Sequence, residues 1–209
     1  LLSSVDIDRN VQVLKSHLEN KGFFNVSVQA DTLVKKRRAR ASYTVTTGVQ
    51  YTIDSVIFPL DTTSALVNTL QQTISSSLLR EGSSFDLEVI KRERQRIDDY
   101  LKERGFYFFN ADYLFIQADS TVGNRKVRLY VTLKPDMPGQ AKNIYHINDV
   151  FIFTSFNLNT AVTDTSKSRA VFHNGYYVVD RQEFYKPKLF ERTMQFNPGE
   201  VYSRTDHNA

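Results

Sequence analysis

Histidine, serine and clustered basic residues are the side chains in this chain that could carry chemistry. The four histidines are His17, His146, His173 and His207, and none has a partner at metal-ligand spacing, such as a second histidine four residues away on a helix. Asp206 adjoins His207, but neighbouring side chains do not face each other on a helix. The chain has no cysteine, no Gly-x-Ser-x-Gly motif and no glycine-rich phosphate loop. We therefore predict no enzymatic activity, no metal and no other cofactor.

The basic run at residues 35–40 is the densest group of charges in the chain. Its five positive charges come from Lys35, Lys36, Arg37, Arg38 and Arg40. The formal net charge of the whole chain is +4, so the remaining residues are close to neutral. Such a run could contact the phosphates of lipid headgroups, lipopolysaccharide or nucleic acid. It is also typical of a solvated hairpin tip, where exposed charges prevent strands from associating edge to edge.

A pattern that occurs twice organises the elements around these residues. Residues 14–24 and 97–107 each read as the end of an amphipathic helix, followed by a basic residue, a glycine and two aromatic residues. Gly22 and Gly105 can adopt the left-handed backbone conformation that ends a helix and turns the chain. After each glycine, apolar and polar residues alternate, which predicts a strand, a short turn and a second strand.

The second copy of this pattern has further elements upstream, and their order defines a complete unit. Residues 51–58 read as a strand, 66–74 as a helix, and Asp86 as the cap of a second helix. The unit is therefore strand, helix, helix, strand, strand. A further unit begins like the first elements of this one, at residues 147–152, and it contains Asn174-Gly175, a good hairpin turn.

These patterns predict an α+β fold made of tandem repeats. Residues 1–49 are the C-terminal part of one repeat, residues 50–136 a complete repeat, and residues 137–209 the N-terminal part of another, with an insert at 153–185. The chain is thus expected to begin and end inside repeats.

The element order, with a glycine and two aromatics after the second helix, resembles the polypeptide-transport-associated (POTRA) repeat of outer-membrane barrel-assembly and translocation-assembly proteins. The resemblance covers nearly the whole chain and is most specific in ERQRI (93–97), GFYFFN (105–110) and FNPGEVYSRTDH (196–207). The last segment is similar to the membrane-proximal repeat of the Bacteroidetes branch. The resemblance implies β-α-α-β-β repeats, each a three-stranded mixed sheet with two helices on one face.

The resemblance also implies a location and partners. The location is the periplasmic face of the bacterial outer membrane, and the activity is non-catalytic capture of unfolded outer-membrane polypeptides. The further partners are a membrane barrel at the C-terminus of the same protein and accessory assembly proteins.

The strand order implied by the resemblance is first-third-second, which leaves the second strand of the complete repeat as an open edge. An extended client could pair with the main chain of that edge. The candidate client-binding residues are Asn110, Asp112, Leu114 and Ile116, which the alternation places facing away from the helices. An apolar open face at Leu114 and Ile116 indicates either packing against a neighbouring repeat or client binding.

Two other functions compete with client binding. A helix pair on a small sheet with a basic hairpin also describes KH-like and double-stranded-RNA-binding domains. However, the sequence contains no Gly-x-x-Gly loop and no RRM-like aromatic motif, so we predict no nucleic-acid partner. The remaining alternative is a purely structural spacer, which would bind no client.

Overall fold

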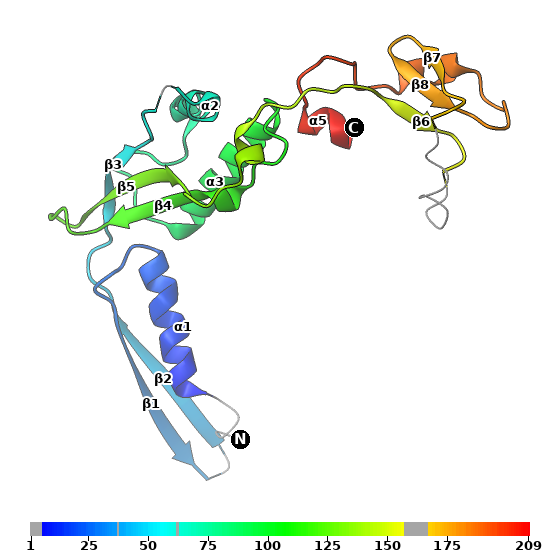
Figure 1. Ribbon diagram of the computed structural model, residues 1–209. Helices are drawn as coiled ribbons and strands as arrows, with labels where there is room; N and C mark the ends of the chain where they lie inside the picture. The colour runs from blue at the N-terminus through cyan, green and yellow to red at the C-terminus, as the bar shows by residue number, and fades with distance from the viewer. Residues whose placement is uncertain (1–5, 37, 62, 157–166) are drawn as a thin grey trace. The chain divides into compact units, whose positions relative to one another are not determined.

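The computed structural model of the chain describes residues 6–36, 38–61, 63–156 and 167–209 (Figure 1). It has two compact units. The first consists of Leu1–Thr63, Val67–Ile97 and Asn110–Met137, and the second of Ser64–Leu66, Asp98–Phe109 and Pro138–Ala209. Over the described ranges, no helix is long and apolar enough to cross a membrane.

The complete repeat has the predicted order of elements and a mixed three-stranded sheet. Its elements are β3 (Thr52–Ile57), α2 (Ala65–Gln71), the 3-10 helix η1 (Ile74–Ser76), α3 (Leu87–Lys102), the 3-10 helix η2 (Ala111–Tyr113), β4 (Leu114–Asp119) and β5 (Lys126–Leu133). The strand order is β3-β5-β4, with β3 parallel and β4 antiparallel to β5. The predicted first-third-second order is therefore confirmed, and β4 is an edge strand.

The core of this repeat lies on one face of the sheet. Val127, Leu129 and Val131 alternate along the central strand β5 and are almost completely buried, as expected for a strand covered on one side. Val127 and Leu129 pack with Ile90 of α3 and with Phe85, which precedes that helix. As predicted, Asp86 caps α3, because its carboxylate accepts a hydrogen bond from the Glu88 amide at 2.9 Å.

The first repeat contributes one helix and a two-stranded antiparallel ribbon. The helix α1 (Ile7–Asn20) lies along the ribbon of β1 (Ser27–Lys35) and β2 (Arg38–Thr46), as Figure 1 shows. A hydrogen bond of 2.9 Å from the side-chain Nδ2 of Asn10 to the Tyr43 hydroxyl joins the helix to β2. Pairing between the two strands continues to Lys35 and Arg38 at the basic tip.

The last part of the chain forms a second mixed three-stranded sheet. It contains β6 (Phe151–Phe153), β7 (Val171–His173) and β8 (Tyr176–Val179), in the order β6-β8-β7. Asn174-Gly175 forms the turn between β7 and β8 with φ of 42° and 92°, so the predicted hairpin turn is confirmed. The 3-10 helices η3 (Gly139–Lys142) and η4 (Pro187–Arg192) and the short helix α5 (Arg204–Asn208) complete this part.

Aromatic pairs support these short strands. The Phe151 and Tyr177 rings are stacked at 4.7 Å, and the Phe172 ring lies 5.1 Å from that of Tyr177. The Lys167 ammonium is 3.9 Å from the Phe151 ring centroid. Because a strand of three residues makes few main-chain hydrogen bonds, such cross-strand contacts contribute a large share of its stability.

The two predicted glycine corners occupy equivalent surroundings. Gly22 and Gly105 have φ of 85° and 88°, the left-handed region that glycine adopts without strain. In each case the glycine carbonyl accepts the amide of a tyrosine that begins the following repeat, Tyr51 for Gly22 (2.9 Å) and Tyr145 for Gly105 (2.8 Å). The chain therefore turns from helix to hairpin and also joins the next repeat at one residue.

The strand pairing beyond each corner is repeated as well. An isolated antiparallel bridge joins Thr52 to Ser84, and a second joins His146 to Val201. These bridges connect the start of a repeat to the loop before its second helix. They agree with the equivalence predicted for the two starting segments, and they show that the two loops are equivalent as well.

Side chains close the first joint within the first unit. The Phe24 ring packs against the rings of Tyr51 (4.9 Å) and Phe85 (5.2 Å). The Lys21 ammonium at the end of α1 donates to the Asp86 carboxylate at 2.8 Å, and this hydrogen bond lowers the pKa of Asp86. The end of one repeat thus holds the helix cap of the next.

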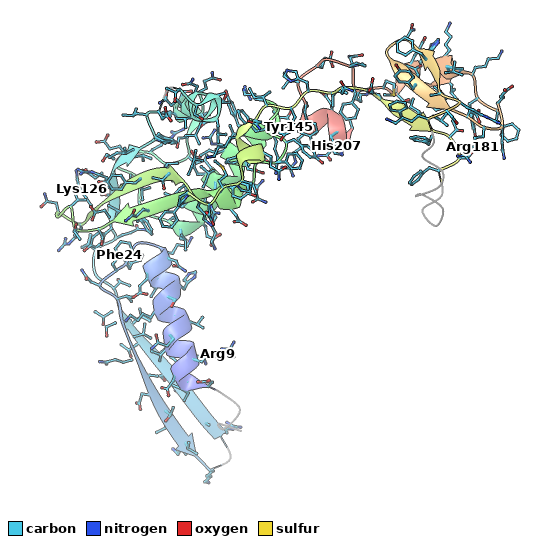
Figure 2. All side chains as sticks on the ribbon, in the orientation of Figure 1. Arg9, Phe24, Lys126, Tyr145, Arg181 and His207 are labelled. Atoms are coloured by element: carbon cyan, nitrogen blue, oxygen red, sulfur yellow. The ribbon has the colours of Figure 1, made fainter. Side chains whose placement is uncertain are left out.

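The second joint, within the second unit, has the same aromatic arrangement with a different polar contact. The Tyr107 ring lies 4.8 Å from that of Tyr202 and 6.5 Å from that of Tyr145, which is labelled in Figure 2. Here the anion lies directly after the preceding helix α3, because Glu103 accepts the Ser203 hydroxyl at 2.8 Å at the start of α5. Burial alone would raise the pKa of Glu103, but the hydrogen bonds that it accepts outweigh burial and lower it.

The compact units follow these joints, and they do not coincide with the ranges 1–49, 50–136 and 137–209. Residues Asp98–Phe109, from the end of α3 through the second corner, belong to the unit that contains the start of the last repeat. The physical reason is that each corner packs onto the following repeat. The division into repeats at 1–49, 50–136 and 137–209 therefore remains a prediction, separate from the division into compact units.

We expect Gly105→Ala to loosen the second joint far more than a matched change at Gly123. Both glycines have φ of 88°, so alanine would cost about 1–2 kcal/mol of backbone strain at either position. A Cβ atom at Gly105 would also lie 2.7 Å from side-chain atoms of Ile144 and Val201, whereas one at Gly123 would meet no heavy atom within 4 Å.

Hydrogen exchange of the amides of Tyr145 and Tyr202 would measure this effect. Exchange should accelerate in Gly105→Ala and stay near the wild-type rate in Gly123→Ala. Equal rates in the two variants would show that the corner does not hold the joint.

Candidate polypeptide-binding groove

The edge strand of the complete repeat begins later than the sequence pattern predicted. Asn110 and Asp112 precede β4, where the Asn110 side chain accepts the Asp112 amide at 2.8 Å and caps the 3-10 helix η2. This turn shifts the alternation, so Leu114 is buried (1% exposed) and Phe115 is exposed (51%). Ile116 packs against the core cluster. The prediction that all four candidate residues face away from the helices on the edge strand was therefore wrong.

The main chain of β4 nevertheless presents an open edge. The Lys134 amide donates to the Tyr113 carbonyl at 2.9 Å, directly before the register that pairs Leu114 with Leu133. Because hydrogen-bonded and non-hydrogen-bonded pairs alternate in an antiparallel ladder, the amides of Ile116 and Ala118 point away from β5. The Leu114 amide also points away from β5, but it donates to the Ala111 carbonyl at the end of η2. No described strand lies on that side of β4.

A groove of about 220 Å³ lies between this edge strand and α3. It is lined by Leu87, Ile90, Lys91 and Arg94 of the helix, by Leu114, Phe115 and Ile116 of β4, and by Lys134. Its aliphatic residues continue the core of the repeat outward, and its cations are at the rim. An open strand edge beside an apolar groove with a few polar groups is typical of sites that bind extended chains.

Arg94 fixes the beginning of the edge strand to the helix. Its guanidinium donates to the Ala111 carbonyl from Nε (3.1 Å) and Nη2 (2.8 Å), and Nη2 also contacts Asp112 Oδ1 at 2.8 Å. The guanidinium therefore contacts both a carbonyl and a carboxylate of the segment before β4. The contact holds η2 and therefore the start of β4.

A buried ion pair holds α3, the helical wall of the groove. The Glu93 side chain is fully buried and accepts hydrogen bonds from Arg96 (2.8 Å), from the Ser77 hydroxyl (2.7 Å) and from the Leu78 amide (3.0 Å). Arg96 also donates to the Thr73 carbonyl at 3.1 Å. Burial alone would raise the pKa of Glu93, but these hydrogen bonds outweigh burial and lower it.

The basic hairpin tip is a second surface of the first unit. Its described cations are Lys35, Lys36, Arg38 and Arg40, and Arg37 lies outside the described residues. Leu33 and Val34, beside the tip, are 63% and 64% exposed. Leu33 is paired with Arg40 and Lys35 with Arg38, so Leu33 shares one face of the ribbon with three cations.

The histidines lie apart from one another in the described part of the chain. The His173 ring contacts Glu191 at 2.8 Å, and the His207 ring contacts the Tyr202 hydroxyl at 2.9 Å. Within the described residues, no group of three or more histidine, aspartate or glutamate side chains could hold a metal ion.

Comparison with known proteins gives similarity only at the level of folds. No model of a protein family matches the chain, and no curated protein does. The chain is similar to the crystal structure of POTRA domains 3–5 of BamA from Haemophilus influenzae, with 13% identity, a TM-score of 0.48, and coverage of 98% of this chain and 66% of that one.

A second similar structure contains POTRA domains 1–3 of the periplasmic domain of Omp85 from Anabaena. The identity is 16% and the TM-score 0.35, and the match covers 95% of this chain and 66% of that one. The chain thus spans 66% of the length of each structure. The function of this chain has to follow from its own residues.

Three features of the groove were missed by the sequence pattern. They are the exposed Phe115, the cation Lys134 directly after β5, and the turn at η2. The sequence contains a signal for the turn, because Asn110 followed two residues later by Asp112 suits a side-chain-capped turn. Nothing in the local sequence indicates that Lys134 lines the groove.

We expect Arg96→Met to lower the free energy of unfolding by about 3–5 kcal/mol, because it leaves the Glu93 carboxylate buried without its partner. The matched control is Arg92→Met on the exposed side of the same helix, which should change stability by less than about 0.5 kcal/mol. Urea unfolding followed by circular dichroism measures both. A similar loss in the two variants would contradict a role for the ion pair.

Proposed function

We propose that this chain binds extended polypeptides by adding them as a further strand at the outer edge of β4. The observation that supports this most directly is the combination of an open edge and a groove. The amides of Ile116 and Ala118 and the carbonyls of Leu114, Ile116 and Ala118 point away from β5, and the groove beside them can take apolar side chains of the added strand.

The energetics of such an edge suit a binder of many different chains. Main-chain hydrogen bonds are the same for every sequence, and each contributes about 0.5–1.5 kcal/mol net. The alternate side chains of the added strand would face the groove. The aliphatic residues Leu87 and Ile116 and the exposed Phe115 place few demands on the shape of those side chains. The site is therefore tolerant of sequence while it requires an extended backbone.

The cellular setting of the proposal rests on the POTRA resemblance of the segments 93–110 and 196–207. We propose that the chain lies at the periplasmic face of the outer membrane and captures unfolded β-barrel clients. It would pass them to a membrane barrel of the same protein, with accessory assembly proteins as further partners. It would act without catalysis and without binding nucleic acid.

We expect Ala118→Pro to weaken peptide binding about tenfold or more while leaving the fold intact. The Ala118 amide points outward, so proline removes a donor from the open edge without breaking the ladder with β5. A suitable probe is a peptide with alternating valine, threonine and tyrosine residues, of the same length as β4 (6 residues), acetylated and amidated at its ends. Isothermal titration calorimetry measures its affinity.

Ala118→Thr is the matched control, because threonine keeps the amide and suits a strand. Its affinity for the probe peptide should stay near wild type. If the proline variant melts at the wild-type temperature and still binds normally, strand addition at β4 is excluded. A chain that never binds the probe peptide would favour a structural spacer.

We also propose that the basic hairpin tip contacts anionic membrane surfaces. The specific observation is that Leu33 and Val34 are exposed beside the cations, which combines apolar insertion with attraction to lipid phosphates. We expect the chain to sediment with vesicles that contain phosphatidylglycerol, and binding should weaken as salt increases. Replacing the four described cations of the tip by glutamine should reduce vesicle binding at least about tenfold, given about 1 kcal/mol for each charge.

The control for this experiment removes four exposed cations elsewhere, namely Lys142, Lys186, Lys188 and Arg192. An equal loss in both variants would show that only net charge matters. Steep, salt-dependent binding to a single-stranded oligonucleotide by the wild type would instead favour the nucleic-acid alternative.

A further inference from the structure

We infer that the β4 groove binds its polypeptide in one direction, antiparallel to β4, and that it recognises a carboxylate at the C-terminal end of that polypeptide. This inference rests on the proposed function and adds the polarity and the chemical class of the bound end. It follows from the unequal distribution of charge along the edge strand.

The cations of the groove gather where β4 begins. Arg94 contacts Ala111 and Asp112, immediately before the strand. The Lys134 amide is bonded to the carbonyl of Tyr113, the last residue before the strand, and the Lys134 side chain lines the groove. The groove therefore has a cationic end beside the start of β4.

Local anions neutralise only part of this charge. Asp112 is the one carboxylate that contacts Arg94 among the described residues, and its side chain is 82% exposed. Within the same part of the chain, Lys134 has no ion pair. The two cations and one anion leave a net positive charge at this end of the groove.

Lys91 adds a further cation on the helical wall of the groove. Its partner is Glu88 at 2.7 Å, and both side chains are more than half exposed. An exposed pair of this kind is weak and can exchange partners at little cost. Lys91 therefore increases the attraction for an anion without fixing its position.

Backbone pairing alone does not choose a direction, because an edge strand can add a partner in parallel or antiparallel orientation. In the antiparallel orientation, the C-terminal end of the added strand lies beside the start of β4. Its carboxylate would then meet the cationic end. In the parallel orientation, the N-terminal ammonium would lie there and be repelled by Lys134 and Arg94.

Three forms of the probe peptide test this inference on the full chain. The first is acetylated and amidated, the second is acetylated with a free C-terminal carboxylate, and the third is succinylated and amidated, so that its carboxylate is at the N-terminal end. We expect the second to bind about two- to fivefold more tightly than the first, the gain of one partly exposed charge pair. The third should bind like the first.

Variants of the chain assign the effect to its residue. Lys134→Gln should remove the gain of the free carboxylate while retaining affinity for the amidated peptide. Lys35→Gln, which removes one charge at the hairpin tip, should leave the gain unchanged.

Three results would overturn the inference: equal binding of the first and second peptides, an equal gain for the third, or a gain that survives Lys134→Gln. Binding of the amidated peptide tests the proposed function alone. If no form binds, strand addition itself has failed, and that result is distinct from the loss of direction.

Discussion

The left-handed glycine corner is the constraint on which the rest of the structure depends. At Gly22 and Gly105 the backbone leaves a helix, turns, and offers its carbonyl to the first strand segment of the following repeat. A residue with a side chain would be strained there and would also collide with that repeat. One glycine thus both ends a helix, through its backbone conformation, and joins two repeats, through its carbonyl. Since the corner bonds to the main chain of Tyr51 or Tyr145, it places no requirement on the other side chains of the joint.

The side chains around the corners can therefore differ, and they do. Both joints place one aromatic ring between two others, but the charged side chain at the end of the preceding helix is a cation in the first joint and an anion in the second. Lys21 meets the capping carboxylate Asp86 in the first joint, whereas Glu103 meets the hydroxyl of Ser203 in the second. Exchanging the two partners would bring like charges or unpaired groups together. The polar contacts thus favour the observed order of repeats, while the aromatic packing and the glycine stabilise any such joint.

Much of this fold could be predicted from the sequence, because its periodicities are strong and its corners are marked by glycine. The strand order, the Asn174-Gly175 turn and the Asp86 cap of α3 agree with prediction. The edge strand could not be placed correctly, because alternation was extended through a segment where it stops. At Asn110 a side chain bonds to the backbone two residues ahead, and this local contact overrides the strand pattern and reverses which residues are buried. Lys134 was missed because its place in the groove depends on long-range packing.

The shift caused by that turn also gives the proposed site its character. Because Leu114 and Ile116 face the core, the apolar groove is continuous with the interior and is held by the buried Glu93–Arg96 pair on α3. The rim of the groove carries the cations Arg94 and Lys134, which lie near the turn and therefore at one end of the strand. In such a site, the backbone edge accepts many client sequences, and the position of the charges sets the direction of the bound chain. A turn of three residues thus decides both which side chains of β4 are buried and at which end of the edge the positive charge gathers.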